Sequence, residues 1–349
     1  MRLPNRRRFL LTALGACGPL GLGAAGWCRW NSNEGDADTG ASTAALPGPA
    51  LQTATESGYA LGAQVAITAL HADDAVARRA VAAAMAELRQ VEALLSIYRP
   101  DSPLSQLNRH GVLEKPHPYL VRILRHCEEM ARRSRGAFDV TVQPLWTLYT
   151  EAHQVGQLPE AAAVAAALRH VDWRRVEVSA ERMRLHGEGT AMTLNGIAQG
   201  FAADRAMEIL RRHGIRHALV DAGEIAAEGQ KAGSEPWTVG IQHPRREDAY
   251  VWLAKLRGRC LATSGDYATC FSDDYRYNHL FDPATGRSPE FFASVSIAAP
   301  TATLADALST AVFVLGAEEG LKLVRAMPGV DALFVFKSGR VFVTEGFPG

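Results

Sequence analysis

Residues 193–201 read TLNGIAQGF, and residues 305–311 read ADALSTA. In the first stretch Gly196 and Gly200 stand on either side of a short segment, and an Ala-rich run follows. A backbone takes this pattern when it passes close to a ligand and then enters a helix. Glycines at this spacing also serve close packing, so the pattern indicates either a binding turn or a helix contact.

The second stretch predicts a helix with two oxygen side chains on one face. Asp306 and Thr310 are four residues apart, which places them one above the other on a helix. Carboxylate and hydroxyl oxygens are ligands for a hard cation, and Mg²⁺ is the natural candidate. A surface pair or a capping pair is the alternative interpretation.

The surrounding segments show strand and helix patterns. Residues 61–70 alternate apolar side chains and predict a strand, whereas residues 73–96 repeat them at helical spacing. Further helices are predicted at 118–134, 160–170, 198–213, 303–315 and 318–326, and strands at 173–179, 182–186, 218–220, 237–242, 251–255, 260–263, 294–298, 332–336 and 341–344. Short strands with hairpin-length turns and occasional helices favour an α+β fold with mainly antiparallel sheets and packed helices.

The N-terminal region predicts export. Residues 1–30 hold Arg6, Arg7 and Arg8 before an apolar run, which is typical of a twin-arginine signal peptide and predicts a periplasmic protein. A membrane anchor is the alternative, but the run is Gly-rich and short of the ~20 strongly apolar residues that a span needs. Lipid attachment at Cys17 is a further alternative. Residues 31–57 predict a flexible linker, and residues 58–349 the folded domain.

Composition excludes some classes of function. The 349-residue chain has 37 basic and 37 acidic residues, a formal net charge of zero, so no nucleic-acid partner is expected. With 47% hydrophobic residues it can bury a full core. Cys127, Cys260 and Cys270 of the folded region are too widely spaced to indicate a disulfide framework or a zinc site.

His279 is the candidate catalytic base. It precedes residues 282–286, DPATG, a turn sequence that would hold the imidazole on a loop near a ligand. A lone histidine is often structural, and His243 and Asp266 are rival candidates.

Several short motifs, taken in order, are similar to those of one family. They are SIYRPDS at 96–102 with LN at 107–108, GAFDVT at 136–141, TLNGIAQGF at 193–201, VDAGE at 220–224, WTVGI at 237–241, ATSGDY at 262–267, HLFDPATG at 279–286 and ADALSTA at 305–311. Over residues 58–345 this series resembles the ApbE family of FAD:protein FMN transferases.

The resemblance implies a fold, a reaction and a set of site residues. The fold would be T-fold-like, with a flavin site between two lobes. Mg²⁺ would sit on the pyrophosphate of the substrate FAD, and FMN would pass to a Thr or Ser hydroxyl of a target protein with release of AMP. The metal ligands would be the carbonyl of Gly196 and the side chains of Asp306 and Thr310. The implied flavin contacts are Leu61, Tyr98, Ala137, Phe138, Asp139, Thr193 and Gln199.

Other residues could complete the site. Thr263, Ser264 and Gly265 offer hydroxyls and backbone amides to a phosphate, although Ser-Gly is also common in loops. The aromatic side chains among the implied flavin contacts would cover the flat ring, or belong to the core. Asp139 could accept a hydrogen bond from the ring or cap its own turn.

Three positions depart from the usual motifs of the family. Thr193 stands where the family has Asp, Gln199 stands where it has Lys, and residues 221–224 are one glycine short. The sequence of residues 193–200, together with an export signal, resembles that of the NosX branch of the family. That branch is associated with maturation of the nitrous-oxide reduction system and with flavinylation of its membrane-bound partner NosR, so a NosR-like target is expected.

Two other functions stay open at this point. A periplasmic flavin-binding or chaperone module without turnover would fit the missing carboxylate and ammonium at Thr193 and Gln199, whereas Asp306 and Thr310 favour activity. An FAD pyrophosphatase would use the same metal, with water in place of the target hydroxyl.

Overall fold

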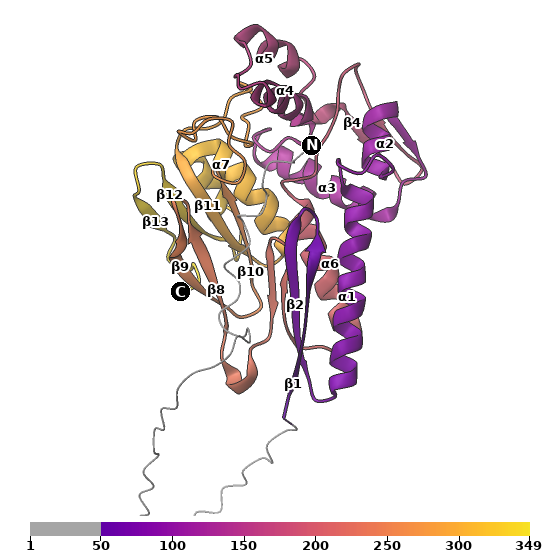
Figure 1. Cartoon of the computed structure of the whole chain (residues 1–349), viewed down its shortest axis with the longest axis vertical. Helices are drawn as coiled ribbons and strands as arrows, with labels where there is room; N and C mark the ends of the chain where they lie inside the picture. The colour runs from indigo at the N-terminus through magenta and orange to yellow at the C-terminus, as the bar shows by residue number, and fades with distance from the viewer. Residues whose placement is uncertain (1–49) are drawn as a thin grey trace, which may run out of the picture.

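The computed structural model describes residues 50–349 (Figure 1). The predicted signal peptide at 1–30 and most of the predicted linker lie outside the described residues. The folded body begins earlier than the predicted residue 58, because β1 (Gln52–Ala60) occupies the end of that linker. Its sequence is polar and its side chains are largely exposed, so the strand depends on pairing with β2 (Ala63–His71) along its whole length.

Eight strands form one sheet, in the order β1-β2-β6-β7-β10-β11-β12-β13, and all neighbouring pairs are antiparallel. Beyond the first hairpin, these strands are β6 (His217–Asp221), β7 (Ile225–Glu228), β10 (Cys260–Gly265), β11 (Phe292–Ala299), β12 (Asp331–Phe336) and β13 (Val341–Val343). The predicted α+β class with mainly antiparallel sheets is therefore confirmed.

The middle of this sheet is narrow. β7 and β10 share only two residue pairs, whereas β10 and β11 pair over six. Just before β7 begins, the carboxylate of Glu224 accepts the Thr263 N–H at 3.0 Å and takes the place of a strand partner. We call this junction, residues 221–226 with 260–265, the seam.

Three long helices cover one face of the sheet (Figure 1). They are α1 (Asp74–Leu95), α6 (Ala198–Arg212) and α7 (Ala302–Arg325), and α6 contacts both of the others. α1 begins as its sequence predicts, because the Asp73 side chain accepts the first N–H groups of the helix. α7 contains both helices predicted at 303–315 and 318–326. Its helical backbone is interrupted between them at Gly316 (φ 78°, ψ −174°), a conformation that only glycine adopts readily.

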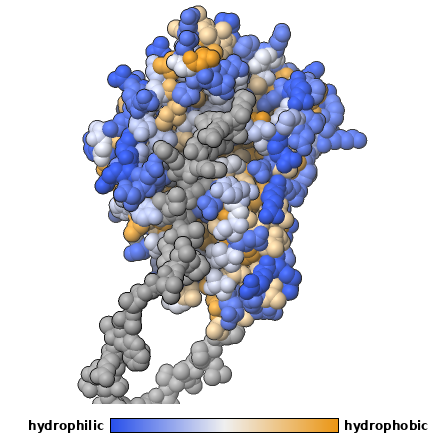
Figure 2. Space-filling model, in the orientation of Figure 1, coloured by the Kyte–Doolittle hydropathy of each residue, from blue (hydrophilic) through white to orange (hydrophobic). Residues whose placement is uncertain are grey.

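The other face is covered by a separate hairpin of β8 (Trp237–His243) and β9 (Arg246–Leu256). Trp237 and Val239 of this hairpin share a core with Leu333 and Val335 of β12. In Figure 2 the visible surface is mostly hydrophilic, with apolar residues scattered over it. No helix in the described part of the chain is long and apolar enough to cross a membrane.

The remaining elements gather at one end of the molecule (Figure 1). They are α2 (Pro103–His110), α3 (Pro118–Arg133), α4 (Gln143–Gln154), α5 (Ala161–Leu168), and a small sheet of β3 (Val112–Glu114), β5 (Arg182–Leu185) and β4 (Val176–Val178). The hairpin predicted at 173–186 is confirmed as β4 and β5. α4 and α5 share a separate aromatic core with Phe271 and Phe281.

Candidate active site

The turn before α6 lies against α7, as the paired motifs predict. A Cβ atom on Gly196 would be 3.0 Å from Thr310 Oγ1 and 3.6 Å from Phe138 Cε2. Only a residue without a side chain lets the backbone of this turn approach Thr310 and Phe138 so closely. Three predicted site residues from three distant segments therefore meet at one point.

Asp306 is fixed to the same turn. Its Oδ2 accepts the Gly200 N–H at 2.8 Å, and only 4% of the residue is exposed. A Cβ atom on Gly200 would be 2.2 Å from the Ala302 carbonyl oxygen, so this glycine permits contact between α6 and α7. Gly200 thus allows α6 and α7 to pack closely, and its backbone N–H also binds the Asp306 carboxylate.

Burial sets the protonation of the acids around the seam. It raises the pKa of Asp306 to about 7, against the opposing effect of the Gly200 N–H. It likewise raises the pKa of Glu224, to which the charge of Asp306 adds, and it raises the pKa of Asp221 to about 7. Burial destabilises the ionised form of these carboxyl groups, and a cation bound to one of them would stabilise its ionised form.

The donor set fits a hard cation. Gly196 offers a carbonyl, Asp306 a carboxylate and Thr310 a hydroxyl, all oxygen ligands of the kind that Mg²⁺ prefers. Within residues 50–349 there is no group of three or more His, Cys, Asp or Glu residues suited to a metal ion. A cation here would have one carboxylate ligand from the protein, together with the Gly196 carbonyl and the Thr310 hydroxyl, and would take its remaining ligands from substrate and water.

Other contacts hold the turn in place. Asn108 on α2 exchanges two hydrogen bonds of 2.8 Å with the backbone of Met192, and the Thr193 N–H donates to the Val140 carbonyl at 2.8 Å. The Thr193 hydroxyl accepts the N–H of Asn195 at 3.2 Å. Asn108 therefore supports the turn. The sequence indicated this residue only through the family resemblance of the LN motif, because its partner Met192 lies far along the chain.

Leu61 and Gln199 also come together, beside Gly223 of the seam. The Gln199 side chain lies over Gly223 (φ 94°), where a Cβ atom would be 2.4 Å from Nε2. Gln199 Nε2 also donates to the Leu61 carbonyl at 3.5 Å, the upper limit for a hydrogen bond. Leu61 occupies the β1–β2 turn at φ 54°, a conformation that a non-glycine residue seldom adopts.

The residues before η2 (Val140–Val142) have well-defined structural roles. Phe138 is buried beside Gly196. Asp139 accepts the N–H and hydroxyl of Thr141 and the N–H of Trp173, so it caps its own turn, and burial raises its pKa. The capping alternative for Asp139 is thus what the structure shows. Ala137 is half-buried on the same turn.

The hydroxyls of Thr263 and Ser264 are used inside the protein. Thr263 Oγ1 is 2.8 Å from Ser296 Oγ, and Ser264 Oγ is 2.7 Å from Ser309 Oγ. The Thr263 amide is bonded to Glu224, and Gly265 is buried at the end of β10. Both hydroxyls and the Thr263 amide are therefore already bonded within the protein, which argues against the predicted phosphate nest.

Tyr98 and His279 lie on loops. Tyr98 follows α1 and is 46% exposed. The His279 N–H donates to the Thr269 carbonyl at 3.0 Å, and its ring packs edge-on near Trp146, with the ring centroids 6.5 Å apart. The assignment of His279 as the base and of Tyr98 to the flavin stays a prediction.

The two rival bases are differently placed. Asp266 is fully buried and binds Arg245 through two hydrogen bonds of 2.7 and 2.8 Å, with Lys337 3.5 Å away. These two cations bind the carboxylate into the fold, which argues against a role as base. His243 accepts the Arg245 N–H at its Nδ1, and partial burial lowers its pKa.

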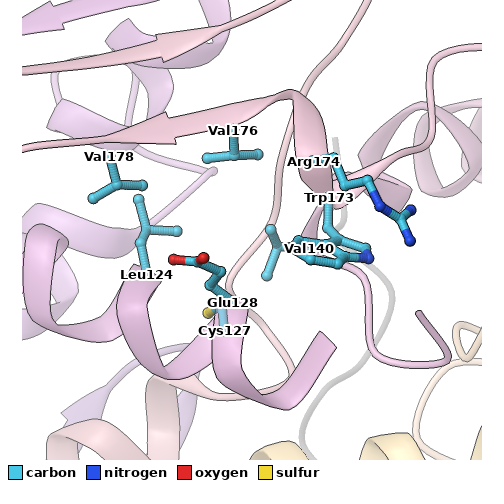
Figure 3. A pocket seen from close by; sticks show the side chains of 8 residues that line it. All are labelled: Leu124, Cys127, Glu128, Val140, Trp173, Arg174, Val176 and Val178. Carbon is cyan, nitrogen blue, oxygen red and sulfur yellow. The ribbon is translucent and has the colours of Figure 1, made fainter. Parts of the chain in front are cut away.

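A separate cavity of about 190 Å³ lies beside α3 (Figure 3). Its walls are mainly apolar, with one acid and one arginine, and the lining residues are Leu124, Cys127, Glu128, Val140, Trp173, Arg174, Val176 and Val178. None of the predicted flavin or metal residues lines it. Burial raises the pKa of the Cys127 thiol, so this cysteine is not a reactive thiolate.

Comparison with known sequences bears on these motifs. Residues 61–334 match the sequence profile of the ApbE family. An FAD:protein FMN transferase of Treponema pallidum (strain Nichols) is 36% identical over 283 residues, which cover 74% of this chain and 77% of that protein. Another, from Klebsiella pneumoniae (strain 342), is 30% identical over 320 residues, covering 88% of this chain and 91% of the relative.

Solved structures show the same architecture. The ApbE protein of Thermotoga maritima superposes with a TM-score of 0.77 at 30% identity, covering 84% of this chain and 97% of that one. The apo form of the Pseudomonas stutzeri flavinyl transferase ApbE gives 0.74 at 28% identity, with 84% and 95% covered. With its motifs, its antiparallel architecture and its sequence all in agreement, the chain belongs to the ApbE family.

Proposed function

We propose that this chain, a flavin transferase of the ApbE family, takes FMN from FAD and attaches it to a Thr or Ser hydroxyl of a target protein, with release of AMP. The observation that carries the proposal is the meeting of Gly196, Asp306 and Thr310 beside Phe138. Relatives named FAD:protein FMN transferases span most of this chain and supply the reaction.

In this proposal Mg²⁺ is held by the Gly196 carbonyl, Asp306 and Thr310. When bound, it would neutralise charge on the FAD pyrophosphate and polarise it as a Lewis acid. The Gly200 N–H orients the Asp306 carboxylate, which must be ionised to act as a ligand. Phe138 is buried beside Gly196, and in this proposal its aromatic ring would border the flavin ring.

We further propose His279 as the group that removes the proton from the target hydroxyl. His279 is half-buried on its loop, and imidazole is the side chain that most often acts as a general base. His279→Asn should reduce the rate of FMN transfer at neutral pH and flatten its dependence on pH. A variant with the wild-type pH profile would remove His279 from this role.

The reaction is tested by intact-mass measurement of an acceptor domain incubated with the protein, FAD and Mg²⁺, with and without a chelator. A chelator-sensitive gain of one FMN moiety, matched by one AMP, is the expected result. Free FMN and AMP without a mass gain would instead identify a pyrophosphatase. FAD bound without turnover would identify a binding module, the function compatible with Thr193 and Gln199.

The biological setting is a separate part of the proposal. The motif at 193–200 and the twin-arginine pattern at residues 6–8 support assignment to the NosX-like branch, periplasmic location and a NosR-like membrane-bound acceptor in nitrous-oxide reduction. A soluble NosR-type flavin domain is the acceptor to try first. Flavinylation of unrelated acceptors at the same rate would contradict this target. Replacing Arg6 and Arg7 with Lys should retain the protein in the cytoplasm, which cell fractionation would detect.

A further inference from the structure

Three hydroxyl groups form a chain between β10 and α7. Ser309 Oγ donates to the Asp306 carbonyl at 2.9 Å, Ser264 Oγ lies 2.7 Å from Ser309 Oγ, and Ser264 Oγ lies 3.1 Å from Thr310 Oγ1. Ser309 is fully buried and Ser264 is 8% exposed. These hydrogen bonds thus link the Thr310 hydroxyl, a side-chain ligand of the proposed cation site, to the backbone carbonyl of Asp306, and the link runs through Ser264, a residue outside α7.

Counting protons fixes the direction of each hydrogen bond. A hydroxyl has one proton to donate, and a carbonyl oxygen can only accept. Ser309 gives its proton to the Asp306 carbonyl, so Ser264 must donate to Ser309. Because Ser264 has already donated its only proton, Thr310 must be the donor in the hydrogen bond between Thr310 and Ser264.

We propose that Ser264 is a positioning residue that presents the lone pairs of Thr310 Oγ1 to the cation. A neutral hydroxyl coordinates a metal only through a lone pair, so its proton must point elsewhere. Ser264 accepts that proton. The Gly196 turn also lies against Thr310 Oγ1, since a Cβ atom on Gly196 would be 3.0 Å from this oxygen. This inference rests on the proposed cation site and gives it a supporting residue in β10.

A purely structural role for Ser264 would be to fasten β10 to α7. The adjacent strand offers a matched control for that role. Ser296 on β11 is also fully buried, and its hydroxyl lies 2.8 Å from Thr263 Oγ1, but it has no hydrogen bond to the Ser264–Ser309–Thr310 chain among the described residues. Ser296→Ala therefore removes a buried hydroxyl from the same region without touching Thr310.

The test is cation affinity, measured with Mn²⁺ as the probe by electron paramagnetic resonance on the whole protein. Ser264→Ala should weaken Mn²⁺ binding about tenfold, the usual effect of losing a group that orients a metal ligand. Ser296→Ala should bind Mn²⁺ as the wild type does. Thermal unfolding without metal should show both variants folded, with similar losses of stability.

A double-mutant comparison shows whether Ser264 acts through Thr310. In a Thr310→Val background, Ser264→Ala should have no further effect on Mn²⁺ affinity, whereas in Thr310→Ser the tenfold loss should return. Equal losses in the Val and Ser backgrounds, an equal loss in Ser296→Ala, or no loss in Ser264→Ala would each overturn the inference. If the wild type itself bound no Mn²⁺ and transferred no FMN, the proposed function would fail instead.

Discussion

Asp306 is buried, and the proposed metal site requires its carboxylate to be ionised. Its pKa is raised to about 7 by burial, and its Oδ2 accepts the Gly200 N–H. A protonated or amide side chain can keep that contact, but it is a poor ligand for Mg²⁺. If the proposed site is correct, Asp306 can be buried in its protonated form without the cation and must ionise to bind it.

The first prediction follows from this balance. Asp306→Asn should keep the apoprotein folded, because the amide oxygen can accept the Gly200 N–H and no buried charge remains. It should lose both FMN transfer and the increase in melting temperature that Mg²⁺ gives the wild type. Differential scanning fluorimetry with and without Mg²⁺ measures the second effect. A variant that Mg²⁺ still stabilises would remove Asp306 from the metal site.

Asp221 provides a prediction on pH. Its buried carboxyl has a pKa raised to about 7, above the ordinary ~4, so the unfolded state loses its proton first and the free energy of unfolding falls between about pH 4 and 7. Asp221→Asn removes this loss. The variant should be more stable than the wild type at pH 8 by about 1–3 kcal/mol, and no more stable at pH 4.

Urea unfolding of both proteins at these two pH values measures the difference. The comparison should be made without Mg²⁺, so that cation binding does not contribute. Asp306 is present in both proteins and cancels. The charge of Asp221 also raises the pKa of Glu224, so Asp221→Asn adds a further gain in stability of the same sign at pH 8 through Glu224. An equal stability difference at pH 4 and pH 8 would show that Asp221 is not the titrating group.

Sequence predicted some site residues better than others. Gly196, Asp306 and Thr310 could be predicted together, because each belongs to a recognisable motif and a helical spacing links two of them. The partners of Asp266 could not be predicted, since Arg245 and Lys337 reach it from separate segments. The same holds for Ser264, whose hydroxyl turns toward α7 only because of how β10 packs.

Two glycines at the start of α6 act through different contacts. A Cβ atom on Gly200 would meet the backbone of α7 at 2.2 Å, whereas one on Gly196 would meet the Thr310 side chain at 3.0 Å. Backbone cannot yield without moving the whole helix, but a side chain can rotate. Substitution of Gly200 therefore tests the packing of α6 against α7, whereas substitution of Gly196 tests the position of the Thr310 side chain.

The matching prediction compares two alanine variants. Gly200→Ala should destabilise the protein by roughly 2–4 kcal/mol, at or above the usual cost of overpacking, because α6 and α7 must move apart. Gly196→Ala should stay close to wild-type stability while its Mg²⁺ affinity falls, because Thr310 is displaced. Urea unfolding and Mn²⁺ binding measure the two effects. The idea fails if Gly196→Ala is the less stable variant, or if it binds Mn²⁺ normally.

α1 and the β4–β5 hairpin could be predicted from sequence, whereas β1 and β7 could not. The 22-residue α1 shows a regular apolar stripe and an N-cap, so its bounds follow from local pattern. β1 has a polar sequence and becomes a strand by pairing with β2. β7 has four residues, too few to show a period, and its place depends on β6 and β10.

On the scale of the molecule, the site lies where the large sheet is least continuous. One half, β1-β2-β6-β7, contributes the Leu61 turn and the Glu224 contact, and the other half contributes β10, packed under α7. The segment that leads into α6 contacts both halves, because Gln199 lies over Gly223 and Gly196 lies beside Thr310 of α7. An α+β fold with antiparallel sheets could be predicted from strand spacing, but the narrow join of β7 to β10 depends on long-range pairing that no local pattern encodes.

The most direct test of the central claim is a crystal structure of the protein with FAD and Mn²⁺, with the cation located by anomalous scattering. The account predicts an anomalous peak between the Gly196 carbonyl, Asp306 and Thr310, in contact with the FAD pyrophosphate and with the flavin ring near Phe138. A cation bound by other residues, or FAD bound away from the seam, would contradict the account.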